Sequence, residues 1–219
     1  MMVNLPTQAE RAVPRAGRIA VGAILAVFGG LVATTAWKAL TAPWRIDDFP
    51  EELAIKAELL PGIFTVHMIA GGLALVLVPL AIALSGRPRW HRPVARLVAL
   101  DVAVAGITAF PVALIAPVTR GSAWGFTAQG LIWLVLLALG IRAIHQRQIA
   151  RHRACMLLMA AAASGAVFFR IYLALWAIFA QGRHYELFYA VDAWVAWAVP
   201  LTLTALVLKR NGAWSGHPA

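Results

Sequence analysis

The sequence predicts an all-α fold, a polytopic membrane helix bundle with about six transmembrane helices. Of its 219 residues, 62% are hydrophobic and 13% are charged, whereas soluble domains have about 45–50% apolar and about 25% charged residues. The apolar residues form continuous runs, each long enough for the roughly 20 residues that a helix needs to cross a bilayer. Because the runs lack the alternation of membrane β-strands, a barrel is excluded.

The apolar runs define the expected domain organisation. They cover residues 19–40, 63–84, 93–118, 124–144, 154–180 and 187–208. We expect a six-helix transmembrane domain at 19–208 between cytoplasmic tails at 1–18 and 209–219. The first run exceeds the roughly 7–15 apolar residues of a signal peptide, which predicts an uncleaved helix.

The longest connection, residues 41–62, is expected on the outer side of the membrane. It holds five of the nine acidic residues, and the sequence after Pro50 is typical of a helix start. We therefore expect a short helix lying at the membrane interface. Its apolar face would consist of Leu53, Leu59 and Leu60.

The basic residues predict the topology. They cluster in the N-terminal tail, in the second-to-third and fourth-to-fifth connections, and in the C-terminal tail. The positive-inside rule therefore places both termini in the cytoplasm. A bias toward Ala, Arg and Trp is typical of a GC-rich bacterial source, so we expect a bacterial plasma (inner) membrane. The net charge of +10 arises from these clusters, so the bilayer, and no nucleic acid, is the expected partner.

The sequence argues against several classes of site. The lone Cys155 forms neither an intrachain disulfide nor a CxxC pair, so no metal site is expected. No phosphate loop, nucleophile elbow, dinucleotide fingerprint or HExxH motif appears. Catalytic activity and oligomeric state stay open at this stage.

Four ionisable residues lie within the apolar runs, where such residues usually mark a function or a structural pair. At about 1.5 Å per residue, His67, Arg170 and Asp192 fall in the outer third of the bilayer, and Asp101 falls near its midplane. In one reading, an Arg170–Asp192 ion pair joins two helices. In another, Arg170 and His67 bind an anionic or hydrophobic small molecule, and in a third Arg170 snorkels to the interface. Asp101 would be either a proton relay or a protonated carboxyl group that bonds across helices.

Two further histidines, His91 and His152, stand at or beside the starts of the third and fifth runs. Imidazoles on different helices can ligate one haem axially, so a haem b site using His91, His152 or His67 is one hypothesis. Neighbouring guanidinium groups would then neutralise the haem propionates, namely Arg92, Arg96 and Arg153. The alternative is that both histidines are solvated caps at the lipid head groups.

In their order along the chain, these features resemble the uncharacterised bacterial membrane-protein family called domain of unknown function 2306 (DUF2306). The features are a His followed by Gly residues, two His-Arg pairs at helix starts, an intramembrane Arg and a late Trp. Here they are His67 with Gly71 and Gly72, His91-Arg92 with Arg96, His152-Arg153 with Met156, Arg170, and Trp194. Ala95 and Cys155 replace a Gly and a Trp of the family pattern. The resemblance covers residues 67–208 and implies a multi-helix membrane protein without an established reaction.

Three functions are compatible with these residues. The first is a bundle that binds or transports a small molecule or lipid through His67, Arg170, Asp192 and Asp101. The second is a membrane redox protein linked to b-type haem or to quinone. The third is an accessory bundle whose charged residues only hold helices together.

Overall fold

The computed structural model describes residues 15–45 and 49–212, with the backbone alone for residues 15–21 and 24. This part of the chain is helical and contains no strand, so the all-α prediction is confirmed. Its elements are α1 (Arg15–Leu40), the 3-10 helix η1 (Ala42–Trp44), α2 (Glu51–Leu59), α3 (Pro61–Ala83), α4 (Pro88–Leu114), α5 (Arg120–His145), α6 (Ile149–Ala163), α7 (Gly165–Ala180) and α8 (Tyr185–Arg210).

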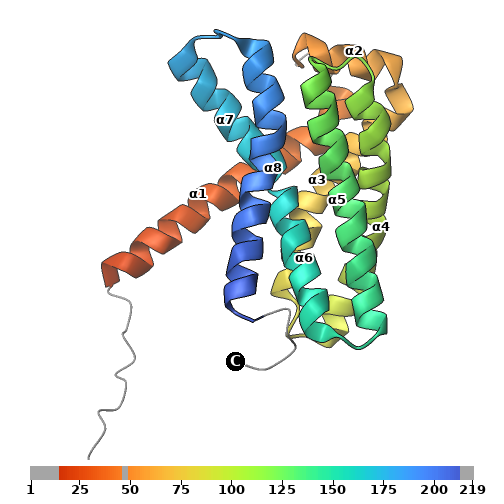
Figure 1. Cartoon of the computed structure of the whole chain (residues 1–219), viewed down its shortest axis with the longest axis vertical. Coiled ribbons are helices and arrows are strands. Elements are labelled where there is room, and N and C mark those ends of the chain that lie inside the picture. Colours follow the sequence, from red (N-terminus) through yellow and green to blue (C-terminus); the bar gives the residue numbers. More distant parts are fainter. Residues whose placement is uncertain (1–14, 46–48, 213–219) are drawn as a thin grey trace, which may run out of the picture.

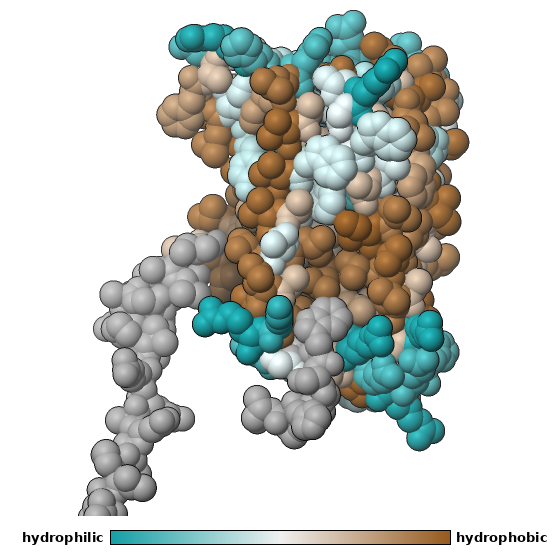
Figure 2. All heavy atoms as spheres, in the orientation of Figure 1, coloured by the Kyte–Doolittle hydropathy of each residue, from teal (hydrophilic) through white to brown (hydrophobic). Residues whose placement is uncertain are grey.

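Five helical segments are long and apolar enough to cross a membrane: α3, α4, α5, α8 and the segment Ile149–Ala180 that joins α6 to α7. The sixth expected helix is present as α1, whose described apolar part, Leu25–Leu40, is shorter. Figure 2 shows the same property on the surface, where an apolar band lies between two hydrophilic ends. The prediction of a multi-pass membrane bundle is therefore confirmed.

The long helices run alternately up and down between two ends of the bundle (Figure 1). We call the end that carries α2 the α2 end. The opposite end, where α3 and α5 finish and α4 and α6 begin, carries the basic connections and is called the arginine-rich end. The helices α3 to α6 form two antiparallel hairpins, and α8 packs against α5, α6 and α7. Helix α1 crosses the bundle obliquely and packs mainly on α3.

Large side chains fill the half of the bundle nearer the arginine-rich end. The core there comprises Val78, Ala81, Val98, Val102, Leu136, Leu137, Leu158 and Met159. Between α5 and α8, Gly125 brings the backbones together, because a Cβ at this position would lie 2.8 Å from the Ala193 carbonyl oxygen. Glycine permits such a close approach of membrane helices, where packing contributes most of the association energy.

A break at Ser164 separates α6 from α7 within the fifth apolar run. The Ser164 hydroxyl donates to the Ala161 carbonyl oxygen at 2.6 Å, and such back-bonding bends membrane helices. Beyond this point α7 leans away from the bundle axis (Figure 1). It contacts α1 near Phe28 and Phe168, whose ring centroids are 5.9 Å apart.

Helix α2 confirms the short helix expected in residues 41–62, but its inward face differs from the prediction. Leu59 is 54% exposed, whereas Lys56 and Ala57 are buried. The reason is that the Lys56 ammonium group reaches two backbone carbonyl groups at the end of α4. The hydrogen bonds of Lys56, and not only the packing of leucine side chains, therefore orient α2.

Candidate functional site

The α2 half of the bundle encloses a cavity of about 720 Å³. Helices α1 and α3 to α8 form its walls, α6 through its last residue alone, and residues of the η1–α2 connection and α2 cover it. Small residues create the space; a Cβ added to Gly71, for example, would meet no atom within 4 Å. A cavity of this size, mostly apolar with a few converging polar groups, is typical of small-molecule sites.

The charged side chains that line the cavity are all of one sign in the described part of the chain. Among the described residues that line it, four are cationic and none carries a carboxylate; the cations are Lys38, Arg45, Lys56 and Arg170. In an environment of low dielectric constant, a cation without a carboxylate partner favours a bound anion, and the partners of Arg170 decide whether it is such a cation.

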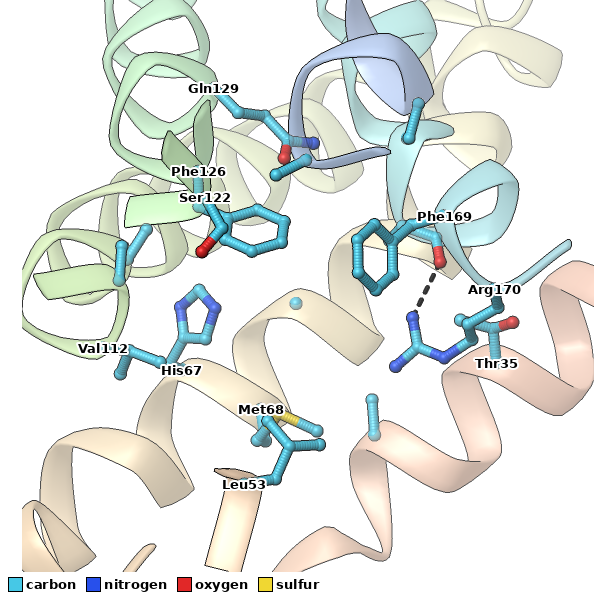
Figure 3. A pocket seen from close by; sticks show the side chains of 18 of the residues that line it. Thr35, Leu53, His67, Met68, Val112, Ser122, Phe126, Gln129, Phe169 and Arg170 are labelled. Carbon is cyan, nitrogen blue, oxygen red and sulfur yellow. Dashed lines mark hydrogen bonds between the residues drawn. The ribbon is translucent and has the colours of Figure 1, made fainter. Parts of the chain in front are cut away.

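Arg170 is the cation that lies deepest among the helices. It extends from α7 toward the cavity (Figure 3), and its Nη1 donates to the Ala166 carbonyl oxygen at 2.7 Å. Within the described part of the chain, no other hydrogen bond or ion pair involves this guanidinium group. Since guanidinium has five N–H donors, most of its hydrogen-bonding capacity is available to a ligand.

The predicted Arg170–Asp192 ion pair is wrong. Asp192 is only 2% exposed, but neither of its carboxylate oxygens has a hydrogen-bond partner among the described residues. It does not line the cavity, and instead borders a shallow apolar groove between α7 and α8. The two residues therefore have similar depths but lie on different faces of the helix pair.

His67 projects from α3 into the opposite side of the cavity (Figure 3). Its Nδ1 lies 3.2 Å from the Ala105 carbonyl oxygen and 3.2 Å from the Thr108 hydroxyl oxygen. The Thr108 hydroxyl donates its own hydrogen to the Val104 carbonyl oxygen at 2.7 Å. Both neighbours of Nδ1 are thus acceptors, which fixes the hydrogen on Nδ1 and leaves Nε2 as an acceptor.

Gln129, on α5, supplies a third polar group to the wall. Its amide nitrogen donates to the Ala162 carbonyl oxygen at 2.9 Å. A carbonyl group accepts only from the nitrogen, so this bond fixes the orientation of the amide. The Gln129 Oε1 is then an acceptor, and Figure 3 shows it toward the cavity.

Aromatic rings lie between these polar groups. The centroids of Phe126 and Phe169 are 5.4 Å apart, and those of Phe169 and Tyr189 are 5.1 Å apart, with edge-on geometry in both pairs. Such arrangements are favoured for aromatic pairs. The three rings give the cavity a rigid apolar surface beside Arg170.

Lys56 connects α2, which covers the cavity, to the end of α4. It is 7% exposed, and its Nζ donates to the carbonyl oxygens of Val112 and Ile115, where α4 ends. A cation at a helix C-terminus satisfies free carbonyl groups and interacts favourably with the helix dipole. Burial lowers the pKa of Lys56.

The model of the family "Predicted membrane protein (DUF2306)" matches residues 64–208. The chain belongs to the DUF2306 family. The match includes His67, Gln129 and Arg170, whereas α1 and α2 lie outside it. Comparisons with curated proteins and with solved structures gave no match.

The two other histidines of this DUF2306 protein close the turns of its helical hairpins. His91 Nδ1 hydrogen bonds to the Ala81 carbonyl oxygen at 2.9 Å, and His152 Nδ1 to that of Gly140 at 3.0 Å. Neither residue lines the cavity. The nearby Arg92, Arg96 and Arg153 are exposed.

The positions of His67 and His91 exclude this pair as the two axial ligands of one haem. His67 and Ala81, the partner of His91, are fourteen residues apart on α3, which corresponds to roughly 21 Å. Axial ligands must both contact the same iron, so His67 cannot share a haem with His91. In the described part of the chain, no three His, Cys, Asp or Glu side chains form a group that could hold a metal ion.

Asp101 lies at the middle of α4 and does not line the cavity. Its buried Oδ2 has no hydrogen-bond partner among the described residues. The expected hydrogen bond from Asp101 to another helix is therefore absent here, and its role as a proton relay stays a prediction.

The sequence analysis missed Gln129 and Lys56. Gln129 is the only amide residue within the apolar run 124–144, and this is the signal that could have identified it. For Lys56 the signal was weaker, because a lysine on a short polar helix usually remains in solvent.

Proposed function

We propose that this DUF2306 protein binds an acidic amphiphile, of the fatty-acid type, in the cavity of its α2 half. Arg170 carries the proposal, because it is a guanidinium group within a membrane bundle that has no carboxylate partner among the described residues. A buried cation of this kind is stabilised by a bound anion. The aromatic and small apolar lining suits an acyl chain.

The shape of the cavity supports a ligand that comes from the bilayer. Lys38 on α1 and Ala174 and Ala177 on α7 line the cavity and are also exposed. Toward the α2 end, α7 diverges from α1 (Figure 1), and the two helices contact each other only near their crossing. The cavity is thus accessible from the side where lipid would lie.

Binding of stearate to the purified protein in detergent tests this function. We expect stearate to raise the midpoint of thermal unfolding, and octadecanol, which lacks the charge, to raise it far less. A hydrogen bond to a charged group contributes about 1.5–3 kcal/mol, so Arg170→Gln should weaken stearate binding about 10- to 100-fold. Arg183→Gln, at an exposed arginine just beyond α7, is the matched control. Equal stearate affinity in the two variants would contradict the proposal.

We further infer that the arginine-rich end faces the cytoplasm of a bacterial plasma membrane, so that the cavity opens in the outer leaflet. The basic residues of the two hairpin connections and of the end of α8 support this orientation. A green fluorescent protein fused to the C-terminus should fluoresce, and a periplasmic alkaline phosphatase fused there should be inactive. The opposite pair of results would reverse the topology.

A further inference from the structure

Two acceptors in the cavity have their hydrogen-bonding direction fixed by the protein backbone. Nδ1 of His67 donates to the Ala105 carbonyl oxygen, so Nε2 offers only a lone pair. The amide nitrogen of Gln129 donates to the Ala162 carbonyl oxygen, so Oε1 is the remaining acceptor. Neither Nε2 nor Oε1 has a hydrogen-bond partner among the described residues.

Two donors that line the cavity, Ser122 and Lys56, are already used by other groups. The Ser122 hydroxyl donates to the Thr119 carbonyl oxygen at 2.8 Å within the cap of α5. The Lys56 ammonium group donates to the end of α4. Leaving a polar group without a partner in a low-dielectric site costs about 1–3 kcal/mol. No described donor forms a hydrogen bond with Nε2 or Oε1, so a ligand in the cavity can supply the missing donor.

These acceptors and Arg170 lie on different sides of the same space. Figure 3 shows His67 beside Ser122 and Phe126, and Arg170 beside Phe169 and Thr35, with the cavity between them. A ligand held at Arg170 by an acidic group would thus extend past the aromatic rings toward the two acceptors. A purely hydrocarbon chain would leave both acceptors unsatisfied.

We propose that the ligand is a hydroxylated acidic amphiphile: its acidic group binds Arg170, and a hydroxyl group on its chain donates to His67 Nε2 or Gln129 Oε1. This inference rests on the proposed function and specifies its ligand class. The arrangement selects by polarity as well as by charge, because a site built to hydrogen bond a hydroxyl group discriminates against the analogue that lacks it.

A matched ligand series tests the inference. Dissociation constants would be measured in detergent for stearate and for stearic acids with one hydroxyl group at successive chain positions, by competition with a fluorescent fatty acid. We expect at least one hydroxylated acid to bind about 10-fold more tightly than stearate, which corresponds to about 1.4 kcal/mol.

Variants then assign the acceptor. His67→Phe keeps a ring and Gln129→Met keeps the chain length, but each removes one acceptor, whereas Leu131→Met changes an exposed residue of α5 outside the cavity as a control. We expect one of the first two variants to abolish the ratio between the affinities for the hydroxylated acid and for stearate, and Leu131→Met to preserve that ratio.

Three outcomes would overturn the inference. If stearate binds through Arg170 but no hydroxyl position improves affinity, water satisfies the acceptors and only this inference fails. If the advantage persists in both His67→Phe and Gln129→Met, the hydroxyl group binds elsewhere. If neither plain nor hydroxylated acids bind, the proposed function fails together with the inference.

Discussion

The two halves of this bundle use the same helices for different purposes. Toward the arginine-rich end, α3 to α6 fill the space between them with large side chains such as Val102 and Met159. Toward the α2 end, the same helices present glycine, alanine and isolated polar residues together with aromatic rings such as Phe126, and a cavity remains. In a bilayer, helix association depends on packing more than on the hydrophobic effect. The comparison therefore indicates that the packed half stabilises the fold, whereas the half with the cavity leaves space for a ligand.

Equivalent methionine truncations in the two halves should give the largest contrast. Met159 is 1% exposed within the packed core, so Met159→Ala should lower the free energy of unfolding by about 2–5 kcal/mol. Met68 borders the existing cavity, so Met68→Ala should lower it by about 1 kcal/mol or less. Thermal unfolding in detergent measures both; equal losses would show that the cavity wall is also a packed core.

Two glycine substitutions should change the free energy of unfolding by less than the methionine truncations, and in opposite directions from each other. Gly125→Ala would bring a methyl group to 2.8 Å from a backbone oxygen, and such overpacking costs about 1–3 kcal/mol. Gly71→Ala meets open space and should stabilise the helix by about 0.5–1 kcal/mol. If Gly71→Ala is as destabilising as Gly125→Ala, the space around Gly71 is filled in the protein.

The smallest expected effect concerns pH and the cover of the cavity. Burial lowers the pKa of Lys56 from its ordinary value of 10.5. Between the lowered pKa and 10.5 the unfolded chain binds more protons, so raising the pH through this window should stabilise the fold. The unfolding midpoint of the native protein should therefore rise with pH relative to that of Lys56→Met, which lacks the titrating group. Parallel midpoint curves would mean that the pKa of Lys56 is not lowered.

The sequence predicted the membrane bundle well, because continuous apolar runs in lipid allow few structures besides helices. It also pointed to His67 and Arg170, since ionisable residues within such runs are rare. It failed for the Arg170–Asp192 pair because residue counting gives depth along a helix but not the face on which a side chain lies. It could not show Gln129 as a ligand candidate. That role depends on the hydrogen bond from the Gln129 amide nitrogen to the Ala162 carbonyl oxygen, which leaves the amide oxygen free for a ligand.

His91 and His152 illustrate the same limit differently. Their sequence contexts are similar, and this similarity suggested a shared cofactor. In the structure, each imidazole bonds to the helix that precedes it in the chain, so the two residues have equivalent architectural roles. A haem that both of them ligate stays a prediction.

These two turn-closing bonds bear on how the chain is assembled in the membrane. Each joins residues only ten to twelve positions apart, and local contacts form early and quickly during folding. The α3–α4 pair and the α5–α6 pair can therefore each leave the translocation machinery as a preformed unit with its turn already closed. The cavity, whose walls come from both pairs and from α1, α7 and α8, would be completed only after α8 has been synthesised.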